Sequence, residues 1–297
     1  MSEIVAPELL MAVPNVSDGR HRPLLEGIER AFAPARFLDL HADPDHNRSV
    51  FTLAAPQGEL AAGLVAGARA VVDGVDVSLG GGVHPYVGAL DVMPVVYRSD
   101  GQRGPACAEV LTAAARIGGE LELPVVLYGE LATRPEHRER AWLREGGPPA
   151  LARRIETGEV VPDFGPARAH PTAGAVLAAA RPPLLAFNVD LATPDLDGAR
   201  RIAASIREAN GGLPGVRAIG LWLEQRGCAQ VSTNVHDHLA TPLREIVEAV
   251  RAEAPVAEAE LVGLAPWAAF EGFPADVPLR GFTPGRHVLE NALRALD

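Results

Sequence analysis

The sequence predicts a protein of the α/β (α+β) class, made of two layered subdomains with mixed β-sheets and split βαβ (ferredoxin-like) character. Short apolar runs bounded by Gly and Pro alternate with longer segments whose apolar residues recur at helical spacing. In the second half these segments follow one another as strand, helix, strand, strand, helix and strand, which is the order of the split βαβ motif. At 297 residues the chain is also long enough for its core to divide.

The first half starts with a short strand over residues 9–13, which ends at Pro14. Residues 22–33 are expected to form a helix, because four large apolar residues recur there at helical spacing. The same criteria predict further strands over residues 36–40, 48–54, 75–79, 89–97 and 124–128, and helices over 59–72 and 104–121.

The second half has the same alternation of predicted strands and helices, although its sequence does not repeat that of the first half. Strands are expected over residues 184–189, 216–224, 229–235 and 258–264, and helices over 196–210 and 242–254. Between the halves, residues 145–183 are rich in Gly and Pro and read as a long irregular junction. We therefore predict an N-terminal subdomain over residues 1–180 and a C-terminal subdomain over residues 181–297.

Composition limits the classes of function. The formal net charge of −11 argues against binding to nucleic acid or to anionic membranes. No apolar stretch reaches the length of a membrane span, and the N-terminus lacks the basic region of a signal peptide. These features predict a cytoplasmic protein.

All basic residues other than His are Arg, because the sequence contains no Lys. This excludes a Schiff-base lysine and a phosphate loop of the Walker type, and any site for an anion must be built from Arg. Cys107 and Cys228 are far apart in the sequence, so they give neither a disulfide framework nor a zinc site.

Several collinear motifs carry a resemblance to a known family. In the first half they are Val13-Pro14-Asn15-Val16-Ser17-Asp18-Gly19, Asp43-Pro44-Asp45-His46-Asn47-Arg48-Ser49-Val50, His84-Pro85 and Gly88-Ala89-Leu90-Asp91-Val92-Met93-Pro94. They continue with Leu127-Tyr128-Gly129-Glu130, Arg134-Pro135, Pro162-Asp163-Phe164-Gly165-Pro166, Phe187-Asn188-Val189-Asp190-Leu191, Gln230-Val231-Ser232 and Leu261-Val262-Gly263-Leu264. In this order they resemble the formiminotransferase domain of glutamate formiminotransferases, with its N- and C-terminal subdomains. The resemblance spans roughly residues 9–266, and no counterpart of the cyclodeaminase domain of some members is expected.

The resemblance implies a fold of two α/β subdomains and a folate-dependent enzyme of histidine catabolism. Such an enzyme transfers the formimino group of N-formiminoglutamate to N5 of tetrahydrofolate, which serves as acceptor, and needs no metal. His84 is implied as the catalytic residue. The implied substrate- and folate-binding residues are Asn15, Asp45, Arg48, Tyr86, Arg134, Asp163, Phe164, Gly165 and Gly174.

His84 has chemistry that fits this role. Imidazole titrates near neutrality, so one His can accept a proton from the attacking nitrogen and return it to the leaving nitrogen. The glycines before it, including Gly82, allow a close approach of backbone, and Pro85 fixes the chain after it. Without the family motifs, a His in a Gly-rich loop reads as a surface residue more often than as a catalyst.

Two clusters could be read as metal ligands. Asp43, Asp45 and His46 fit an exposed turn better, in which Asp side chains accept backbone hydrogen bonds. His236 and His238 supply only two ligands and read as a loop. The sequence thus predicts no metal site.

Two alternatives remain open beside the leading function. Where the family has an acidic residue before the histidine and an Arg two positions after it, this chain has Val83 and Tyr86. The enzyme could therefore use another donor, such as a formyl compound or another amidine. The second alternative is a folate-binding protein without catalysis. For an enzyme of this size a homodimer is expected, because two-fold symmetry is the commonest assembly.

Overall fold

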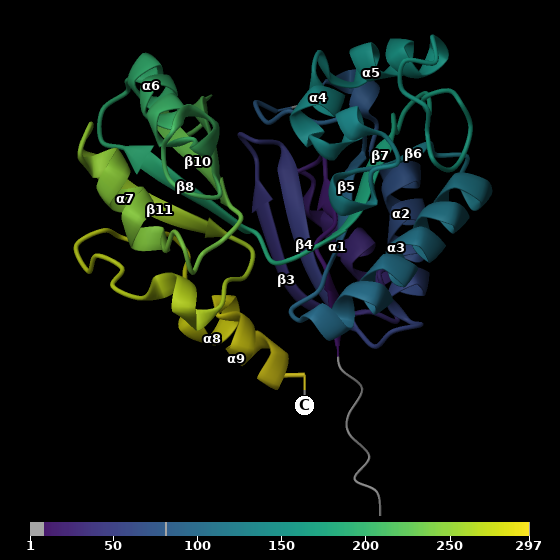
Figure 1. Ribbon diagram of the computed structural model, residues 1–297, viewed down its shortest axis with the longest axis horizontal. Coiled ribbons are helices and arrows are strands. Elements are labelled where there is room, and N and C mark those ends of the chain that lie inside the picture. Colours follow the sequence, from purple (N-terminus) through teal and green to yellow (C-terminus); the bar gives the residue numbers. More distant parts are fainter. Residues whose placement is uncertain (1–8, 81, 297) are drawn as a thin grey trace, which may run out of the picture. The chain divides into compact units, whose positions relative to one another are not determined.

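The computed structural model describes residues 9–80 and 82–296. The chain divides after Pro182 into two compact units, Met1–Pro182 and Pro183–Asp297 (Figure 1). Each unit has a β-sheet and helices of its own, which confirms the predicted α+β class with two layered subdomains.

The first unit is built on a seven-stranded mixed sheet. The strands are β1 (Leu10–Ala12), β2 (Asn15–Val16), β3 (Arg36–Asp43), β4 (Arg48–Ala55), β5 (Leu90–Val96), β6 (Val125–Leu127) and β7 (Val176–Arg181). From one edge they run β3, β4, then β1 and β2 together, β5, β7 and β6. The pairs β5–β7 and β7–β6 are parallel, and the others are antiparallel.

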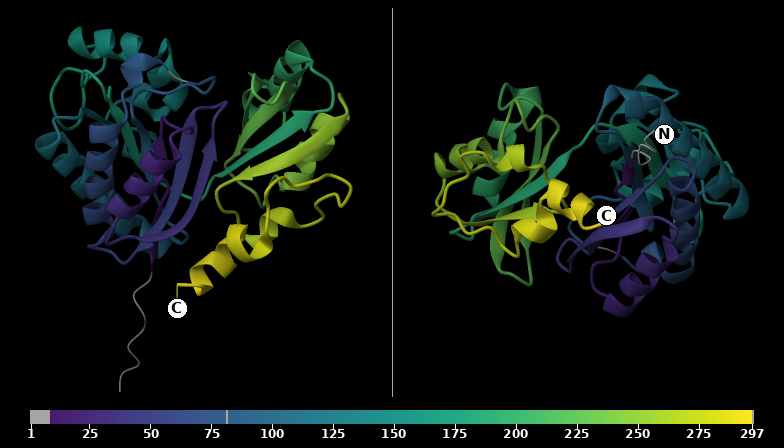
Figure 2. Two further views of the ribbon diagram at one scale, coloured as in Figure 1. Left: turned by 180° about the vertical axis from the view of Figure 1, so that it is seen from behind. Right: turned by 90° about the horizontal axis from the view of Figure 1, so that it is seen from below.

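Three helices cover one face of this sheet (Figures 1 and 2). They are α1 (Arg22–Ala31), α2 (Leu60–Gly74) and α3 (Asp100–Glu120). Two short helices, α4 (Arg140–Arg144) and α5 (Gly147–Glu156), pack on the other face against β5, β6 and β7. Strands buried on both faces have largely apolar sequences, which is why β5, apart from Asp91, and β7, apart from Arg181, lack the alternation of a half-buried strand.

The second unit is a split βαβ fold. Its elements are β8 (Leu185–Leu191), α6 (Leu196–Ile206), β9 (Val216–Leu223), β10 (Cys228–Val235), α7 (Leu243–Arg251) and β11 (Val256–Val262). The sheet order is β11, β8, β10, β9, all antiparallel. Alternate residues of β8, such as Phe187 and Val189, form a core with α6 and α7. The short helices α8 (Pro284–His287) and α9 (Leu289–Arg294) follow.

One expected strand is absent. The sequence predicts a strand over residues 75–79, but the structure has a 3-10 helix at Val77–Leu79. The Asp76 side chain accepts a hydrogen bond from the Ser78 N–H at 2.9 Å, which fixes a turn instead of an extended chain. The prediction was wrong because this local Asp turn overrides the β-propensity of the apolar residues around it.

The expected irregular junction over residues 145–183 is also wrong. This segment holds α5 and the interior strand β7. The run Ala178-Ala179-Ala180 gives no strand signal, because Ala has low β-propensity. As an interior strand it is fully buried on both faces, where small side chains let α3 pack closely.

No helix in the described part of the chain combines the length and the apolar character that a membrane span requires.

Candidate active site

His84 lies in a loop that packs on the turn between β3 and β4. The Val83 N–H donates to the Asp45 carbonyl at 3.2 Å. A Cβ built on Gly82 would lie 2.1 Å from the His46 carbonyl oxygen, so only glycine permits this approach. The imidazole rings of His46 and His84 are stacked, with centroids 6.0 Å apart. Two of the motifs identified in the sequence thus meet at the histidine.

Gly82→Ala is expected to lower kcat by about tenfold or more, because the added methyl must displace the loop from the His46 carbonyl and move the His84 ring. Steady-state kinetics of the variant measure this effect. Gly104→Ala, where a Cβ meets nothing within 4 Å, is the control and should keep wild-type kcat. Equal activity of the two variants would contradict the close packing.

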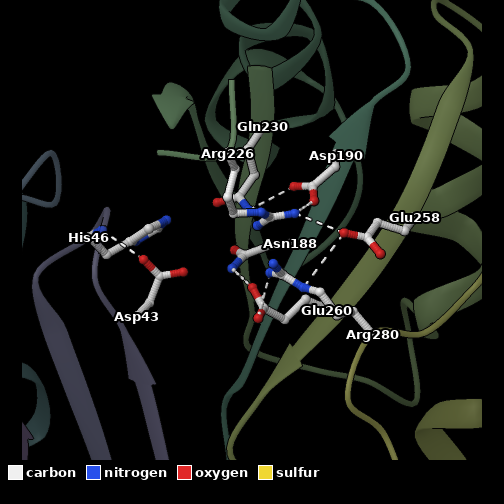
Figure 3. Close-up of polar contacts among 9 residues, drawn as sticks. All are labelled: Asp43, His46, Asn188, Asp190, Arg226, Gln230, Glu258, Glu260 and Arg280. Atoms are coloured by element: carbon white, nitrogen blue, oxygen red, sulfur yellow. Dashed lines mark hydrogen bonds and ion pairs between the residues drawn. The ribbon is translucent and has the colours of Figure 1, made fainter. Parts of the chain in front are cut away.

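The β3–β4 turn is ordered by its own polar side chains. Asp43 Oδ1 accepts a hydrogen bond from the His46 N–H at 2.8 Å, drawn in Figure 3. The Asn47 side chain accepts from the Gly19 N–H at 3.1 Å and so joins the turn to the segment after β2. Asp43 serves the turn, as predicted, but the prediction that the turn is exposed was wrong: Asp43, Asp45 and His46 are buried, because the loop that carries His84 packs on them. Within the described residues, no group of three His, Cys, Asp or Glu side chains is arranged to hold a metal.

A buried carboxylate organises the site beneath this loop. Asp91 on β5 is fully buried, and it pairs with Arg48 at 2.7 Å and with Arg144 of α4. Burial alone would raise the pKa of Asp91, but the charges of Arg144 and Arg48 outweigh it and hold that pKa below its ordinary value. Arg48 Nε also donates to the Asn15 side-chain oxygen at 3.1 Å.

The surroundings keep His84 neutral. Burial is the largest cause, and the positive charges of Arg48 and Arg144 add to it, so the pKa of His84 lies well below 6.5. Its Nδ1 atom is buried and has no hydrogen-bond partner among the described residues. A neutral imidazole at pH 7 can accept a proton, and the same charges make the protonated ring a strong acid.

Two further arginines lie close to Tyr128, which follows β6. The guanidinium carbon of Arg140 is 5.5 Å from the centre of the Tyr128 ring. Burial is the largest cause that lowers the pKa of Arg140 to about 10. The positive charges of Arg144 and Arg181 act in the same direction, while Tyr128 acts in the opposite direction. Arg181, at the end of β7, donates to the Pro182 carbonyl at 3.0 Å, and its Nε is buried without a hydrogen-bond partner in the described chain.

The short helix α4 is held in place by the helix that follows it. The Arg154 guanidinium lies 3.7 Å from the centre of the Trp142 ring and donates to the Trp142 carbonyl at 2.9 Å. On its other side Trp142 contacts the ring of His137, with centroids 5.9 Å apart. These contacts fix Arg140 and Arg144, which are four residues apart and share a face of α4.

His137 gives a test of how firmly this region is packed. It is fully buried, neither ring nitrogen has a hydrogen-bond partner in the described chain, and burial lowers its pKa. The unfolded state therefore gains a proton near pH 6.5 while the folded state does not, so this residue costs stability as the pH falls. We expect His137→Phe to remove up to about 1 kcal/mol of the stability loss between pH 7.5 and 5.5. Urea unfolding at both pH values measures it, and an unchanged loss would contradict the assigned burial.

Some residues expected at the site have structural contacts elsewhere. Asp163 accepts from the Leu127 N–H at 2.7 Å and from the Thr133 hydroxyl at 2.6 Å. Phe164 packs against the core of the first unit. Arg134 begins the turn at Pro135–Arg138, where its charge acts on the pKa of His137.

The two glycines expected to bind folate also have packing roles. Gly165 has φ +80, and a Cβ at this position would lie 2.7 Å from the Leu123 carbonyl oxygen. At Gly174, with φ +67, the corresponding distance to the Val87 carbonyl oxygen is 2.5 Å. Both positions need glycine for backbone packing alone.

Of the expected residues, Asn15, Asp45 and Arg48 are joined to His84 by the contacts above. Tyr86 is two residues further along the loop, and burial raises the pKa of its hydroxyl. Sequence reasoning missed Asp91, Arg140 and Arg144 as site residues. Asp91 did carry a signal, because a charged residue inside an apolar strand must be paired.

The second unit carries a separate polar network on the sheet face opposite α6 and α7. On β8, Asn188 and Asp190 alternate with the core residues and so point to this face. Figure 3 shows the network, in which Arg226 pairs with Asp190 and with Glu258, the latter at 2.9 Å. Its other members are Gln230, Glu260 and Arg280. Its carboxylates and guanidinium groups are mutually paired.

Comparison with known proteins identifies the family. A family model for the formiminotransferase domain, N-terminal subdomain, matches residues 9–181, and one for the formiminotransferase domain matches residues 186–272. The chain therefore belongs to the formiminotransferase family, and it is a transferase enzyme.

Its relatives agree with this class. The chain is 34% identical over 268 residues to a glutamate formimidoyltransferase of Streptococcus pyogenes, covering 87% of this chain and 89% of that protein. It is 35% identical over 269 residues to a glutamate formimidoyltransferase of Thermoplasma acidophilum, covering 87% and 88%. A formimidoyltransferase-cyclodeaminase of Mus musculus is 37% identical over 277 residues, which are 87% of this chain and 50% of that protein.

Proposed function

We propose that the enzyme transfers the formimino group of N-formiminoglutamate to N5 of tetrahydrofolate, with His84 as general acid and base. The observation that carries this proposal is the lowered pKa of His84, a neutral imidazole beside Arg48 and Arg144 in a loop held by backbone contacts. The names of the relatives support the donor. The family supports the folate acceptor, which acts as a substrate, and the proposed reaction uses no metal.

The chemistry assigns one proton to the imidazole. N5 of the folate attacks the amidine carbon, and the C–N bond that forms makes N5 cationic. Neutral His84 takes the proton from N5. The imidazolium then gives a proton to the glutamate nitrogen, the old C–N bond breaks, and glutamate leaves as an amine. Because Arg48 and Arg144 disfavour the charged ring, the second transfer is downhill for His84.

The test is direct. Purified enzyme, N-formiminoglutamate and tetrahydrofolate should yield 5-formiminotetrahydrofolate and one equivalent of glutamate. Formation of glutamate without a change in the folate would contradict the acceptor, and inactivity with this donor would contradict the donor.

A different donor is the second candidate, because Val83 and Tyr86 stand where the family has charged residues. Val83 is 43% exposed, and the raised pKa of Tyr86 keeps its phenol neutral. Neutral neighbours suit a formyl donor, which carries no amidinium charge. A donor panel that includes N-formylglutamate and 5-formyltetrahydrofolate separates the candidates. Folate binding without turnover on any donor would leave only the binding function.

We further propose that the enzyme acts in the cytoplasm as a homodimer. The net charge of −11 and the frequency of two-fold assemblies support this. Sedimentation equilibrium should give twice the chain mass of 31.2 kDa, and a monomer mass would contradict it.

A further inference from the structure

The four arginines around Asp91 and Tyr128 form two pairs with different roles. We infer that Arg140 and Arg181 bind a carboxylate of the donor, whereas Arg48 and Arg144 are committed to Asp91 and tune His84. The identity of the anion as a donor carboxylate rests on the proposed function. The division of the arginines rests on contacts within the first unit alone.

Charge separates the two pairs of arginines. The charge of Arg144 acts on Arg48 and on Arg140, and the charge of Arg181 acts on Arg140 as well. The carboxylate of Asp91 acts on Arg48, Arg140 and Arg144. The two carboxylate oxygens of Asp91 bind Arg48 and Arg144. Arg140 and Arg181 thus remain a partly buried excess of positive charge. Such an excess is costly unless an anion joins it.

The groups around Tyr128 have the geometry of a carboxylate site. Arg140 lies over the ring of buried Tyr128, and Arg181 enters from the end of β7 with its Nε buried and without a hydrogen-bond partner in the described chain. The Tyr128 hydroxyl is buried as well. Two guanidinium forks and a phenol are the donors that hold a carboxylate in a fixed plane.

Helix α4 connects these arginines to the charges around the catalytic histidine. Arg140 and Arg144 are one helical turn apart on α4, and the charge of Arg144 acts on His84. A carboxylate bound at Arg140 therefore lies about one helical turn, roughly 5–6 Å, from the charge cluster that surrounds the imidazole. The glutamate part of an amidine donor has a carboxylate within a few bonds of its reacting carbon, so a carboxylate held at Arg140 and Arg181 brings that carbon toward the imidazole.

The experiment uses glutarate as a probe in isothermal titration calorimetry with the full chain. Wild type should bind glutarate. Arg140→Gln and Arg181→Gln should each weaken glutarate binding about ten- to a hundredfold, the loss expected for a charged hydrogen-bonded pair. In turnover, both variants should raise KM for the donor by a similar factor and change kcat little. Arg153→Gln, an exposed position on α5, is the matched control.

Melting temperatures of each variant exclude a folding defect, and Arg140→Met repeats the test with a side chain of similar length. Unchanged glutarate affinity in the Arg140 and Arg181 variants would overturn the inference, as would the absence of glutarate binding by wild type or a loss in Arg134→Gln instead. Should wild type bind glutarate through Arg140 but transfer no formimino group, the proposed function fails while the anion site stands.

Discussion

His84→Ala is expected to lower kcat by about a hundred- to ten-thousandfold, the usual contribution of a positioned general acid and base. KM for both substrates should change much less, because the variant removes a proton carrier and not a binding group. Rapid-quench or steady-state measurement of 5-formiminotetrahydrofolate gives kcat. Added imidazole should restore part of the activity in the variant and none in wild type.

The pH profile makes the expectation stricter. Because burial and two arginines lower the pKa of His84, the ring stays neutral down to that lowered value. Wild-type kcat/KM should therefore stay constant as the pH falls through 6.5, the ordinary pKa of His. It should decrease only at a pH well below that value. The acidic limb should disappear in His84→Ala. His21→Ala, whose side chain is 74% exposed, is the control with unchanged activity. An unaltered acidic limb in His84→Ala would remove His84 from the mechanism.

Asp91→Asn is expected to lower the free energy of unfolding by about 3–5 kcal/mol. The change leaves Arg48 and Arg144 as buried cations, with side chains 10% and 12% exposed, and no carboxylate to balance them. It also weakens the acceptor for the Val87 N–H, now at 2.9 Å from Asp91 Oδ1. Urea unfolding monitored by circular dichroism measures the loss.

A surface ion pair supplies the control for this variant. Asp276 pairs with Arg251 at 3.0 Å, but its side chain is 73% exposed. Asp276→Asn should cost less than about 1 kcal/mol, because water screens such pairs. A loss of similar size in both variants would mean that burial of Asp91 adds nothing to the stability of the first unit.

Much of the fold follows from local patterns. The helices and strands of the second unit were predicted with the right order, because its strands are short apolar runs, such as β8 with its alternating core and polar residues, and each helix has one apolar face. The strand β7 was missed, because its Ala side chains have no periodicity and its burial depends on α3 and α5. Tertiary packing, not propensity, makes that segment a strand.

The same division holds for the site. His84, Asn15 and Arg48 lie in motifs and could be located in the sequence. Arg140 and Arg144 lie on a five-residue helix without a cap or an apolar periodicity. Their position depends on the stacking of Arg154 on Trp142, a contact that no spacing rule predicts. Long-range charge pairing is therefore the part of the site that the sequence alone does not reveal.

The place of β7 in the first sheet has a consequence for synthesis on the ribosome. β7 is the last strand of its unit to be made, yet it lies between β5 and β6. β6 ends at Leu127 and β7 begins at Val176, so at 5–20 residues per second the nascent chain waits roughly two to ten seconds for the strand that joins them. During this interval an emerging β6 has no partner in its final register. A fragment cut before β7 would keep that open edge permanently, and aggregation of such fragments is the expected outcome.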